Sequence, residues 1–523
     1  MKTAVASLIG FVAMTVAFIL LGMWLWPVTL HHLWVFVRLA WPFLASLIIA
    51  VVLFIVPSTL SRITGVLVVL AGLSTAFIGP WVIAQANYKA ISYEDKTYSE
   101  LSYANRAPYD VANRISSSFL GDERGHGTGI MKAIPARSDA GRYSTSLITP
   151  GVAKGYDAVQ VIDLPLYGTP GNGNVMFCHY DKDKAKLRLG GWALWNSLDK
   201  KIARTTSPST TWERDDAVAT CEGAKNDNPM LYVPLMKRTN AAFFPQRVFG
   251  GVAVYNGSTG ELKIYDDLKT DLPLYPKSLA EAARNSTGVK NGYWPWLFHM
   301  SSNGGYDDTS KDANDPNNPN ISEFGLASED HKSSFYITPL TARGSSTSIS
   351  AIGQVESSGE MKSGEYRDFK IFPAKANEAR SANSNIASSI QSMLAEKATN
   401  MHVMEIVPAQ NGNWAASIGN DQSVKYRAII NKDESIDVYD KDGNVIVTTR
   451  SGVKGSPVSG DSGDNGSTGS NDDTVTIPTN GRKLSDMSND ELKKIANQIT
   501  DELIKRADSG EAKKAIAQDE AKK

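Results

Sequence analysis

The chain has 523 residues, a formal net charge of -1, 42% hydrophobic residues and 21% charged residues. These averages are typical of neutral globular proteins and exclude a nucleic-acid binder that works through bulk positive charge. They also exclude a fully disordered chain, and the presence of two cysteines excludes a disulfide-dense mini-protein. The residue types are nevertheless distributed unevenly, and regions of very different composition follow one another along the chain.

The N-terminal region is apolar and lacks acidic residues. Three runs without any charged residue cover residues 4–26, 39–56 and 63–84. A helix rises about 1.5 Å per residue and the hydrocarbon core of a bilayer is about 30 Å thick, so roughly 20 residues are enough to cross it. The sequence therefore predicts three transmembrane helices within a membrane domain at residues 1–90. The alternative is a signal peptide followed by a buried helical hairpin.

Prolines and basic residues refine this prediction. Pro27 and Pro57 follow the first two runs, where a helix would end, and Pro80 predicts a kink or an end inside the third. His31 and His32 are then expected in a short polar loop between the first two spans. The region has four Lys or Arg residues, and they divide almost evenly between the two sides of the membrane. The positive-inside rule consequently favours neither orientation.

A polar, β-rich α+β region is predicted from residue 91 to residue 450. Apolar alternation around a Gly-bearing turn predicts a hairpin at 251–266, and a similar pattern predicts a three-strand meander at 424–449. Helical periodicity predicts helices at 108–120, 278–284 and 376–398. The apolar stripe of the last of these is expected to pack in a core.

A long polar loop at 304–320 is the predicted boundary between two soluble domains, a β-rich domain at 91–303 and an α+β domain at 321–450. The loop also carries oxygen donors of the kind that Ca²⁺ prefers. The candidate ligands are Asp307, Asp308, Asp312, Asn314 and Asp315. Because the twelve-residue calcium-loop pattern is missing, calcium is a weak hypothesis, and no other cofactor is predicted.

The two cysteines, Cys178 and Cys221, are a candidate disulfide. Such a bond would persist if this region lies outside the cytoplasm. The alternative is a pair of buried thiols.

No segment completes a catalytic site. Residues 125–129, Gly-His-Gly-Thr-Gly, resemble the His-Gly-Thr block of subtilisin-like proteases, but the serine block of such enzymes is absent. Residues 460–463, Gly-Asp-Ser-Gly, resemble a chymotrypsin-like nucleophile segment but lie in a polar linker that cannot hold a nucleophile in place. We therefore assign no catalytic residue, and an enzyme is the less favoured class. A hydrolase with a dispersed site around His126, His179 or His299 is the alternative.

Aromatic residues are concentrated at 293–299, Tyr-Trp-Pro-Trp-Leu-Phe-His. We expect this segment to be buried in the core. If it is exposed, it would be a binding surface for carbohydrate, peptide or the nearby bilayer interface.

The C-terminal part consists of a predicted disordered linker at 451–480 and a helical segment at 481–523. Residues 488–491, Ser-Asn-Asp-Glu, form a capping box. One apolar face follows, formed by Leu492, Ile495, Ile499 and Leu503. A single helix cannot bury this face alone, so it predicts a protein partner or self-association. A partly frayed tail is the alternative.

Together these features predict a membrane-anchored, extracytoplasmic binding or scaffold protein in a bacterial or phage-encoded inner membrane. It would belong to a cell-envelope, secretion, transfer or phage-encoded assembly. The expected partners are the lipid bilayer and a protein, and no nucleic acid is expected. A subunit that makes its contacts through the spans is a further possibility.

Overall fold

A computed structural model describes residues 14–450 of the chain, with gaps. The gaps are residues 19, 23–24, 120–126, 129, 136–140, 150–154, 169–172, 182, 184–195, 224, 226, 240–243, 299–303, 309–323, 344–347, 376–379, 396–399 and 421–422. The predicted linker at 451–480 and the predicted helix at 481–523 lie outside the described residues, so both stay predictions.

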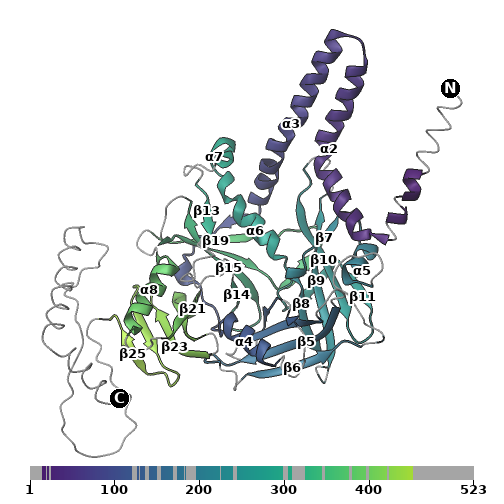
Figure 1. The fold of residues 1–523 in the computed structure, drawn as a ribbon. Coiled ribbons are helices and arrows are strands. Elements are labelled where there is room, and N and C mark those ends of the chain that lie inside the picture. The colour runs from purple at the N-terminus through teal and green to yellow at the C-terminus, as the bar shows by residue number, and fades with distance from the viewer. Residues whose placement is uncertain are drawn as a thin grey trace, which may run out of the picture. The chain divides into compact units, whose positions relative to one another are not determined.

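Two long apolar helices, α2 (Pro27–Ile55) and α3 (Thr59–Tyr88), run side by side and project from a β-rich body (Figure 1). They contain 29 and 30 residues, so each is about 44 Å long and exceeds the roughly 30 Å of a hydrocarbon core. The second and third predicted spans are thus confirmed as apolar helices of spanning length. The first predicted span, 4–26, lies largely outside the described residues and stays a prediction.

Two details of the predicted membrane region are wrong: the third helix does not end at Pro80, and His31 and His32 do not lie in a loop. Pro27 begins α2, because a proline in the first helical turn sacrifices no hydrogen bond, and the helical residues described before it end at residue 25, so a helix does end before Pro27. Pro80 lies inside α3, which continues to Tyr88, since the other helix hydrogen bonds remain and the body supports this end. His31 and His32 lie on α2 and not in a loop.

Glycines at a spacing of seven pack α3 against its neighbours. The buried residues of α3 are Gly65, Gly72 and Gly79. A β-carbon on Gly65 would lie 3.3 Å from Phe54 of α2, and one on Gly72 would overlap Ser46 of α2. Small residues at these positions allow the two helices to approach closely, as is usual inside membranes.

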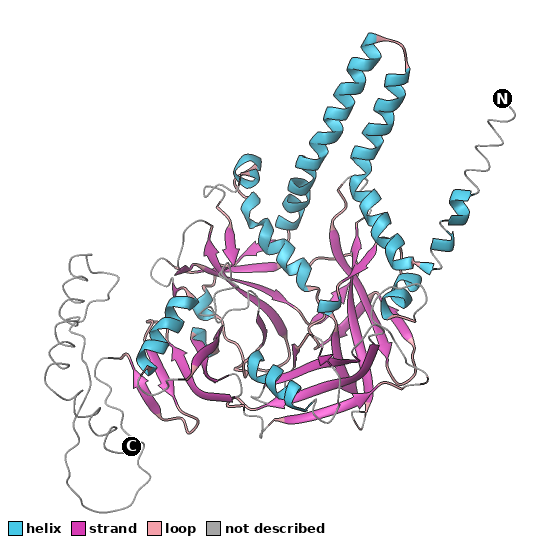
Figure 2. Ribbon diagram, in the orientation of Figure 1, coloured by secondary structure: helices cyan, strands magenta, loops and turns pink. Residues whose placement is uncertain are grey.

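The body consists mainly of strands (Figure 2). Its central sheet has the order β1-β19-β17-β15-β13, with β14 also paired to β15. These strands are β1 (Ile91–Tyr93), β13 (Tyr306–Asp308), β14 (Phe324–Ala327), β15 (Ser334–Ala342), β17 (Ala351–Glu356) and β19 (Phe369–Pro373).

The described part of the body contains three further five-stranded sheets. The β5 sheet contains β2 (Gly127–Thr128), β3 (Lys132–Ile134), β4 (Gly141–Thr149), β5 (Gly155–Leu164) and β6 (Asn174–His179). The β9 sheet contains β7 (Thr210–Trp212), β8 (Val218–Glu222), β9 (Asn228–Arg238), β10 (Arg247–Asn256) and β11 (Leu262–Tyr265). The C-terminal sheet contains β21 (His402–Pro408), β22 (Trp414–Asn420), β23 (Ser423–Ile430), β24 (Ile436–Tyr439) and β25 (Val445–Thr448).

Smaller elements complete the body. Two strand pairs join β12 (Asp267–Thr270) to β18 (Gly359–Lys362) and β16 (Ser348–Ile349) to β20 (Arg380–Ser381). The α-helices are α4 (Tyr109–Phe119), α5 (Leu198–Thr205), α6 (Lys277–Asn285), α7 (Tyr293–Leu297) and α8 (Asn383–Leu394). The 3-10 turns are η1 (Tyr98–Glu100), η2 (Arg214–Asp216), η3 (Ser286–Val289) and η5 (Gln410–Gly412).

The central sheet is buried on both faces. Side chains alternate along a strand with a period of two. In β17, Ala351 and Val355 accordingly belong to a core shared with the β5 and β9 sheets. Ile352, between them, belongs to a second core shared with α8 and the C-terminal sheet. One sheet therefore connects the two cores.

This arrangement bears on the predicted division at 304–320. Strand β1 comes before that loop and pairs in parallel with β19, which comes after it. Strands β12 and β18 also pair across it, in antiparallel orientation. The segments 91–303 and 321–450 are consequently joined by strand pairing and share the first core.

The locally predicted elements are confirmed. The hairpin at 251–266 corresponds to β10 and β11, and the meander at 424–449 corresponds to β23, β24 and β25. The three predicted helices correspond to α4, α6 and α8. The stripe of α8 packs in the second core through Ile386, Ile390 and Leu394.

Candidate functional site

The first candidate site is the junction at which the body meets α2 and α3. On the α2 side, His31 is buried and its Nδ1 lies 3.2 Å from the carbonyl oxygen of Thr210 in β7. Its ring meets the edge of Trp212, with centroids 5.9 Å apart. Further along α2, Nη2 of Arg38 donates to the carbonyl of Thr239 at 3.0 Å. Two polar side chains of an otherwise apolar helix are thus bonded to the backbone of the β9 sheet.

A small polar cavity of about 130 Å³ lies behind His31. Asp199, at the start of α5, lines this cavity and holds a second lining residue in place: Nε1 of Trp212 donates a hydrogen bond to Oδ1 of Asp199 at 2.8 Å. Arg214 donates from Nε to the other carboxylate oxygen at 3.0 Å. These bonds hold the Trp212 ring in the position that His31 contacts.

On the α3 side, the contacts come from several parts of the body. Gly79 packs against Phe244, which follows β9 in the chain. Gln85 donates to the carbonyl of Val289 at 3.4 Å. The hydroxyl of Tyr366 lies 3.3 Å from Oδ1 of Asn87. Strand β1 begins three residues after α3 ends, so the hairpin enters the central sheet almost without a linker.

Arginines gather at this junction. Arg238 and Arg247 are paired residues on β9 and β10, and Arg38 bonds to the residue that follows Arg238. Burial, together with the positive charges of Arg247 and Arg38, lowers the pKa of Arg238 to about 10. Glu213 provides one carboxylate, 3.6 Å from Arg247. Arg38, Arg238 and Arg247 thus outnumber the carboxylate of Glu213 at this part of the junction, beside the apolar hairpin.

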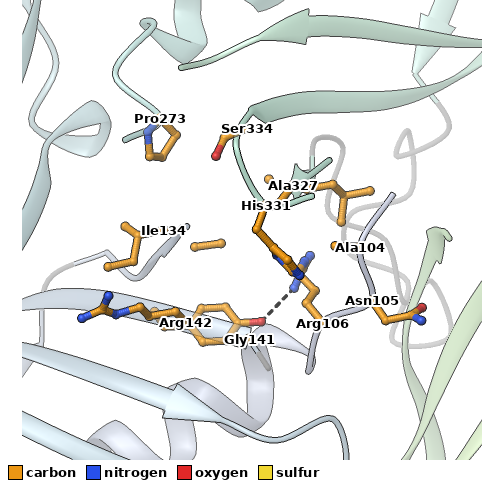
Figure 3. Close-up of a pocket in the computed structure, with 14 residues that line it drawn as sticks. Ala104, Asn105, Arg106, Ile134, Gly141, Arg142, Pro273, Ala327, His331 and Ser334 are labelled. Atoms are coloured by element: carbon orange, nitrogen blue, oxygen red, sulfur yellow. Dashed lines mark hydrogen bonds between the residues drawn. The ribbon is translucent and has the colours of Figure 1, made fainter. Parts of the chain in front are cut away.

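The second candidate site is a cavity of about 40 Å³ inside the body (Figure 3). Arg106 and His331 are among the side chains that line it. Nη2 of Arg106 lies 2.5 Å from Oε1 of Glu405, a residue almost 300 positions later in the chain. Nη1 of Arg106 donates to the hydroxyl of Tyr143 at 3.2 Å, and its guanidinium carbon lies 4.4 Å from the centre of the Tyr109 ring.

Burial dominates the electrostatics of this cluster. It raises the pKa of Glu405, whereas Arg106 beside it acts in the opposite direction. Burial lowers the pKa of Arg427, which donates to Asn105 at 3.2 Å, to about 10. A volume of 40 Å³ holds a few waters and is far too small for a substrate. The cluster is therefore suited to joining the C-terminal sheet to the rest of the body.

The calcium candidates are placed in part. Asp307 and Asp308 lie on β13, where Asp307 pairs with Arg343 and Asp308 with Arg284, both at 3.1 Å. The other three candidates, Asp312, Asn314 and Asp315, lie outside the described residues. The calcium site stays a prediction, and two of its five carboxylate or amide groups already face arginine.

The described part of the chain contains only one of the three histidines named for a hydrolase, so this alternative stays a prediction. His179 ends β6 and is exposed, while His126 and His299 lie outside the described residues. Within the described ranges, no group of three or more His, Cys, Asp or Glu side chains is arranged to hold a metal ion.

Cys178 and Cys221 are joined by a disulfide, with their Cα atoms 5.9 Å apart. Cys178 lies in β6 and Cys221 in β8, so the bond connects the β5 sheet to the β9 sheet. Both residues belong to the core shared with the central sheet.

The aromatic segment differs from its prediction. Its described part contains α7, and Trp294 and Phe298 are 63% and 61% exposed instead of buried. The reason is that Tyr293 holds the segment against Trp81 of α3, with ring centroids 5.7 Å apart. The rings of Trp294 and Phe298 are left on the outside.

Sequence reasoning missed the junction and the Arg106–Glu405 pair. The seven-residue spacing of Gly65, Gly72 and Gly79 is a signal that could have indicated close packing on one face of α3. No comparable signal exists for Arg106 and Glu405, because isolated charged residues are most often exposed.

Comparison with known proteins adds no relationship: no protein-family model matches the chain, and neither a curated protein nor a solved structure does. The function is therefore argued from the junction and the body themselves.

Proposed function

We propose that this protein is a membrane-anchored binding or scaffold protein whose β-rich body lies outside the cytoplasm. It would serve a cell-envelope, secretion, transfer or phage-encoded assembly. The observation that carries the proposal is the docking of α2 and α3 onto the body through His31, Arg38 and Gly79. A body without a linker to its anchor keeps one orientation to the bilayer, which suits the presentation of a surface to a partner.

The composition of the hairpin supports an anchor over a transport pathway. Between Arg38 and Arg62 there is no charged residue, and none lies between Arg62 and Lys89. Transport pathways through membranes normally need ionisable or polar side chains facing the bundle interior.

The disulfide supports the extracytoplasmic placement. Such bonds persist in oxidising compartments and are reduced in the cytoplasm. Because α2 and α3 form a hairpin, residue 27 and the body lie on one side of the bilayer and Ser58 lies on the other.

A labelling experiment tests this topology. The two native cysteines are bonded, so an engineered cysteine is the single reactive thiol of the full chain. We expect Ser462→Cys, in the linker, to react with an impermeant maleimide on whole cells, and Ser58→Cys to react only after lysis. The opposite pattern would place the body in the cytoplasm and end the proposal.

The partner is proposed to bind the C-terminal helical face formed by Leu492, Ile495, Ile499 and Leu503. After gentle solubilisation, a partner should co-purify with the full chain and be lost from a Leu492→Asp, Ile499→Asp variant. A Lys493→Ala, Lys505→Ala variant is the control, since it changes the same segment outside the apolar face. If the same amount of partner co-purified with the full chain and with both variants, the C-terminal helical face would not be the binding site.

A further inference from the structure

An apolar groove of about 540 Å³ lies between α3 and α7. Phe77, Ile78 and Trp81 form its α3 wall, and Tyr293, Trp294 and Leu297 form its α7 wall. In Figure 1, α7 stands beside the end of α3 that enters the body. Segments more than 200 residues apart in the sequence thus build one apolar surface.

Large side chains around this groove are exposed. Phe77, Trp294 and Phe298 are 62%, 63% and 61% exposed. The rings of Trp294 and Phe298 stack with centroids 5.9 Å apart and planes 9° from parallel. A continuous aromatic patch of this kind is unfavourable in water and marks a surface that binds an apolar partner.

The backbone directs α7 away from the body. Gly292, just before α7, has a φ of +103°, a conformation that glycine adopts easily. Trp81 contacts the edge of Tyr293, and Nζ of Lys290 lies 5.2 Å from the centre of the Tyr93 ring. These contacts hold the base of α7 and leave Trp294 on the outer side.

The length of α3 places this groove at the edge of the membrane. Twenty residues from Thr59 to Ile78 span about 30 Å, which is the thickness of the hydrocarbon core. Phe77 and Ile78 then lie at its body-side boundary, and Trp81 lies about one turn further, among the headgroups. Trp41 of α2, 48% exposed, lies near the same end of the hairpin. Tryptophan is enriched at this depth in membrane proteins.

We propose that α7 lies in the membrane interface beside α3 and that the groove between them binds an acyl chain of a bilayer lipid. The inference rests on the proposed membrane anchoring. A lipid is the occupant because the α3 wall continues directly into the exposed apolar surface of the same helix, which includes Leu70, Leu67 and Val66. A chain in the groove is therefore continuous with the hydrocarbon around α3. Through α7, the body acquires a second attachment to the bilayer.

Photo-crosslinking of the full chain tests the occupant. Benzoylphenylalanine replaces Trp294 in the groove, Leu67 in the middle of α3, or Val445, which is 37% exposed on β25. Each chain is placed in nanodiscs of phosphatidylethanolamine and phosphatidylglycerol and irradiated. The mass of the intact protein is then measured by mass spectrometry. We expect a lipid adduct at positions 294 and 67 and none at position 445.

The outcomes separate the two proposals. An adduct at position 67 without one at position 294 overturns the lipid groove and leaves the membrane anchor standing. Absence of adducts at both positions overturns the anchor as well. A crosslink from position 294 to a second protein chain would show that the groove is a protein interface, and the lipid assignment would be wrong.

A depth measurement provides an independent check. Phe298→Cys and Val445→Cys each supply a single thiol for a nitroxide label, because the native cysteines are bonded. At position 298 we expect a higher ratio of collisions with oxygen to collisions with a water-soluble nickel chelate than at position 445. Equal ratios at the two positions would place α7 in water and contradict the proposal.

Discussion

Gly79 of α3 lies directly against Phe244 of the body, so that a β-carbon at position 79 would be 2.5 Å from Cε1 of that ring. Phe244 itself has a φ of +51°, which is uncommon for an aromatic residue. The contact joins the apolar hairpin of α2 and α3 to the segment between β9 and β10. Its closeness makes it a sensitive point at which to test whether the junction is rigid.

We predict that Gly79→Val loosens the junction, because two added methyl groups have no space beside Phe244. Overpacking of this kind costs about 1–3 kcal/mol. Hydrogen exchange of the full chain in detergent should become faster in α3 near residue 79 and at the ends of β9 and β10. The double variant Gly79→Val, Phe244→Ala removes the clash and should recover part of the protection. Unchanged exchange in the single variant would mean that the body is not tightly docked.

A second prediction concerns the buried pair Arg106–Glu405. Arg106→Met leaves the Glu405 carboxylate buried without its partner, and such a loss costs about 3–5 kcal/mol. The thermal midpoint should fall strongly, and adding Glu405→Leu should restore much of it. The control is Lys263→Met in the exposed pair with Glu261, where both side chains are more than half exposed. Exposed pairs contribute about 0–1 kcal/mol. Similar losses in the two single variants would show that the buried pair has no special role.

A third prediction follows from Asp216 in η2. Burial raises its pKa to about 6, well above the ordinary value of an aspartate, although Oδ1 accepts a hydrogen bond from the backbone N–H of Lys277 at 3.2 Å. The folded protein then binds a proton more tightly than the unfolded chain does. The stabilisation is fully present below about pH 4 and is lost as the pH rises through about 6. One pKa unit corresponds to about 1.4 kcal/mol, so the loss amounts to at most about 3 kcal/mol.

Asp216→Asn removes this titration and keeps an oxygen that can accept the bond from Lys277. The thermal midpoint of the variant minus that of the unmodified chain should therefore increase as the pH is raised from 4 to 7. Asp215→Asn, at the exposed neighbouring position, is the matched control. If the difference in thermal midpoint between Asp216→Asn and the unmodified chain stayed constant across this pH range, the raised pKa of Asp216 would be contradicted.

A fourth prediction concerns the disulfide between Cys178 and Cys221. The bonded residues are separated by 43 positions, and closure of a loop of this size is worth about 4 kcal/mol in the chain-entropy model. Reduction, or a Cys178→Ala, Cys221→Ala variant, should lower the thermal midpoint accordingly. Intact mass after alkylation without reduction should show no modified thiol. Two alkylated thiols under native oxidising conditions would rule the bond out.

Much of the local structure could be predicted because it depends on near neighbours in the chain. The length and apolarity of residues 39–56 and 63–84 are enough for helices of spanning length, whatever they contact. A Gly-bearing turn between alternating strands is likewise enough for the hairpin at 251–266. Local patterns failed where tertiary contacts decide the outcome. Pro80 did not end α3, because the remaining helix bonds and the contacts of Gln85 and Asn87 with the body hold its last turns.

The sequence by itself determined the two long apolar helices, the β-rich body and most of its predicted strands and helices, since these follow from composition and from periods of 2 and 3.6 residues. Only the tertiary structure decided that 91–303 and 321–450 share one central sheet, because strand pairing between distant segments leaves no local signal. The same holds for Arg106 and Glu405, which are recognisable as a pair only once folding has removed both from water. The exposure of Trp294 was decided in this way as well. The aromatic segment around Trp294 is equally suited to a core, and the contact of Tyr293 with Trp81 leaves Trp294 on the outside, beside α3.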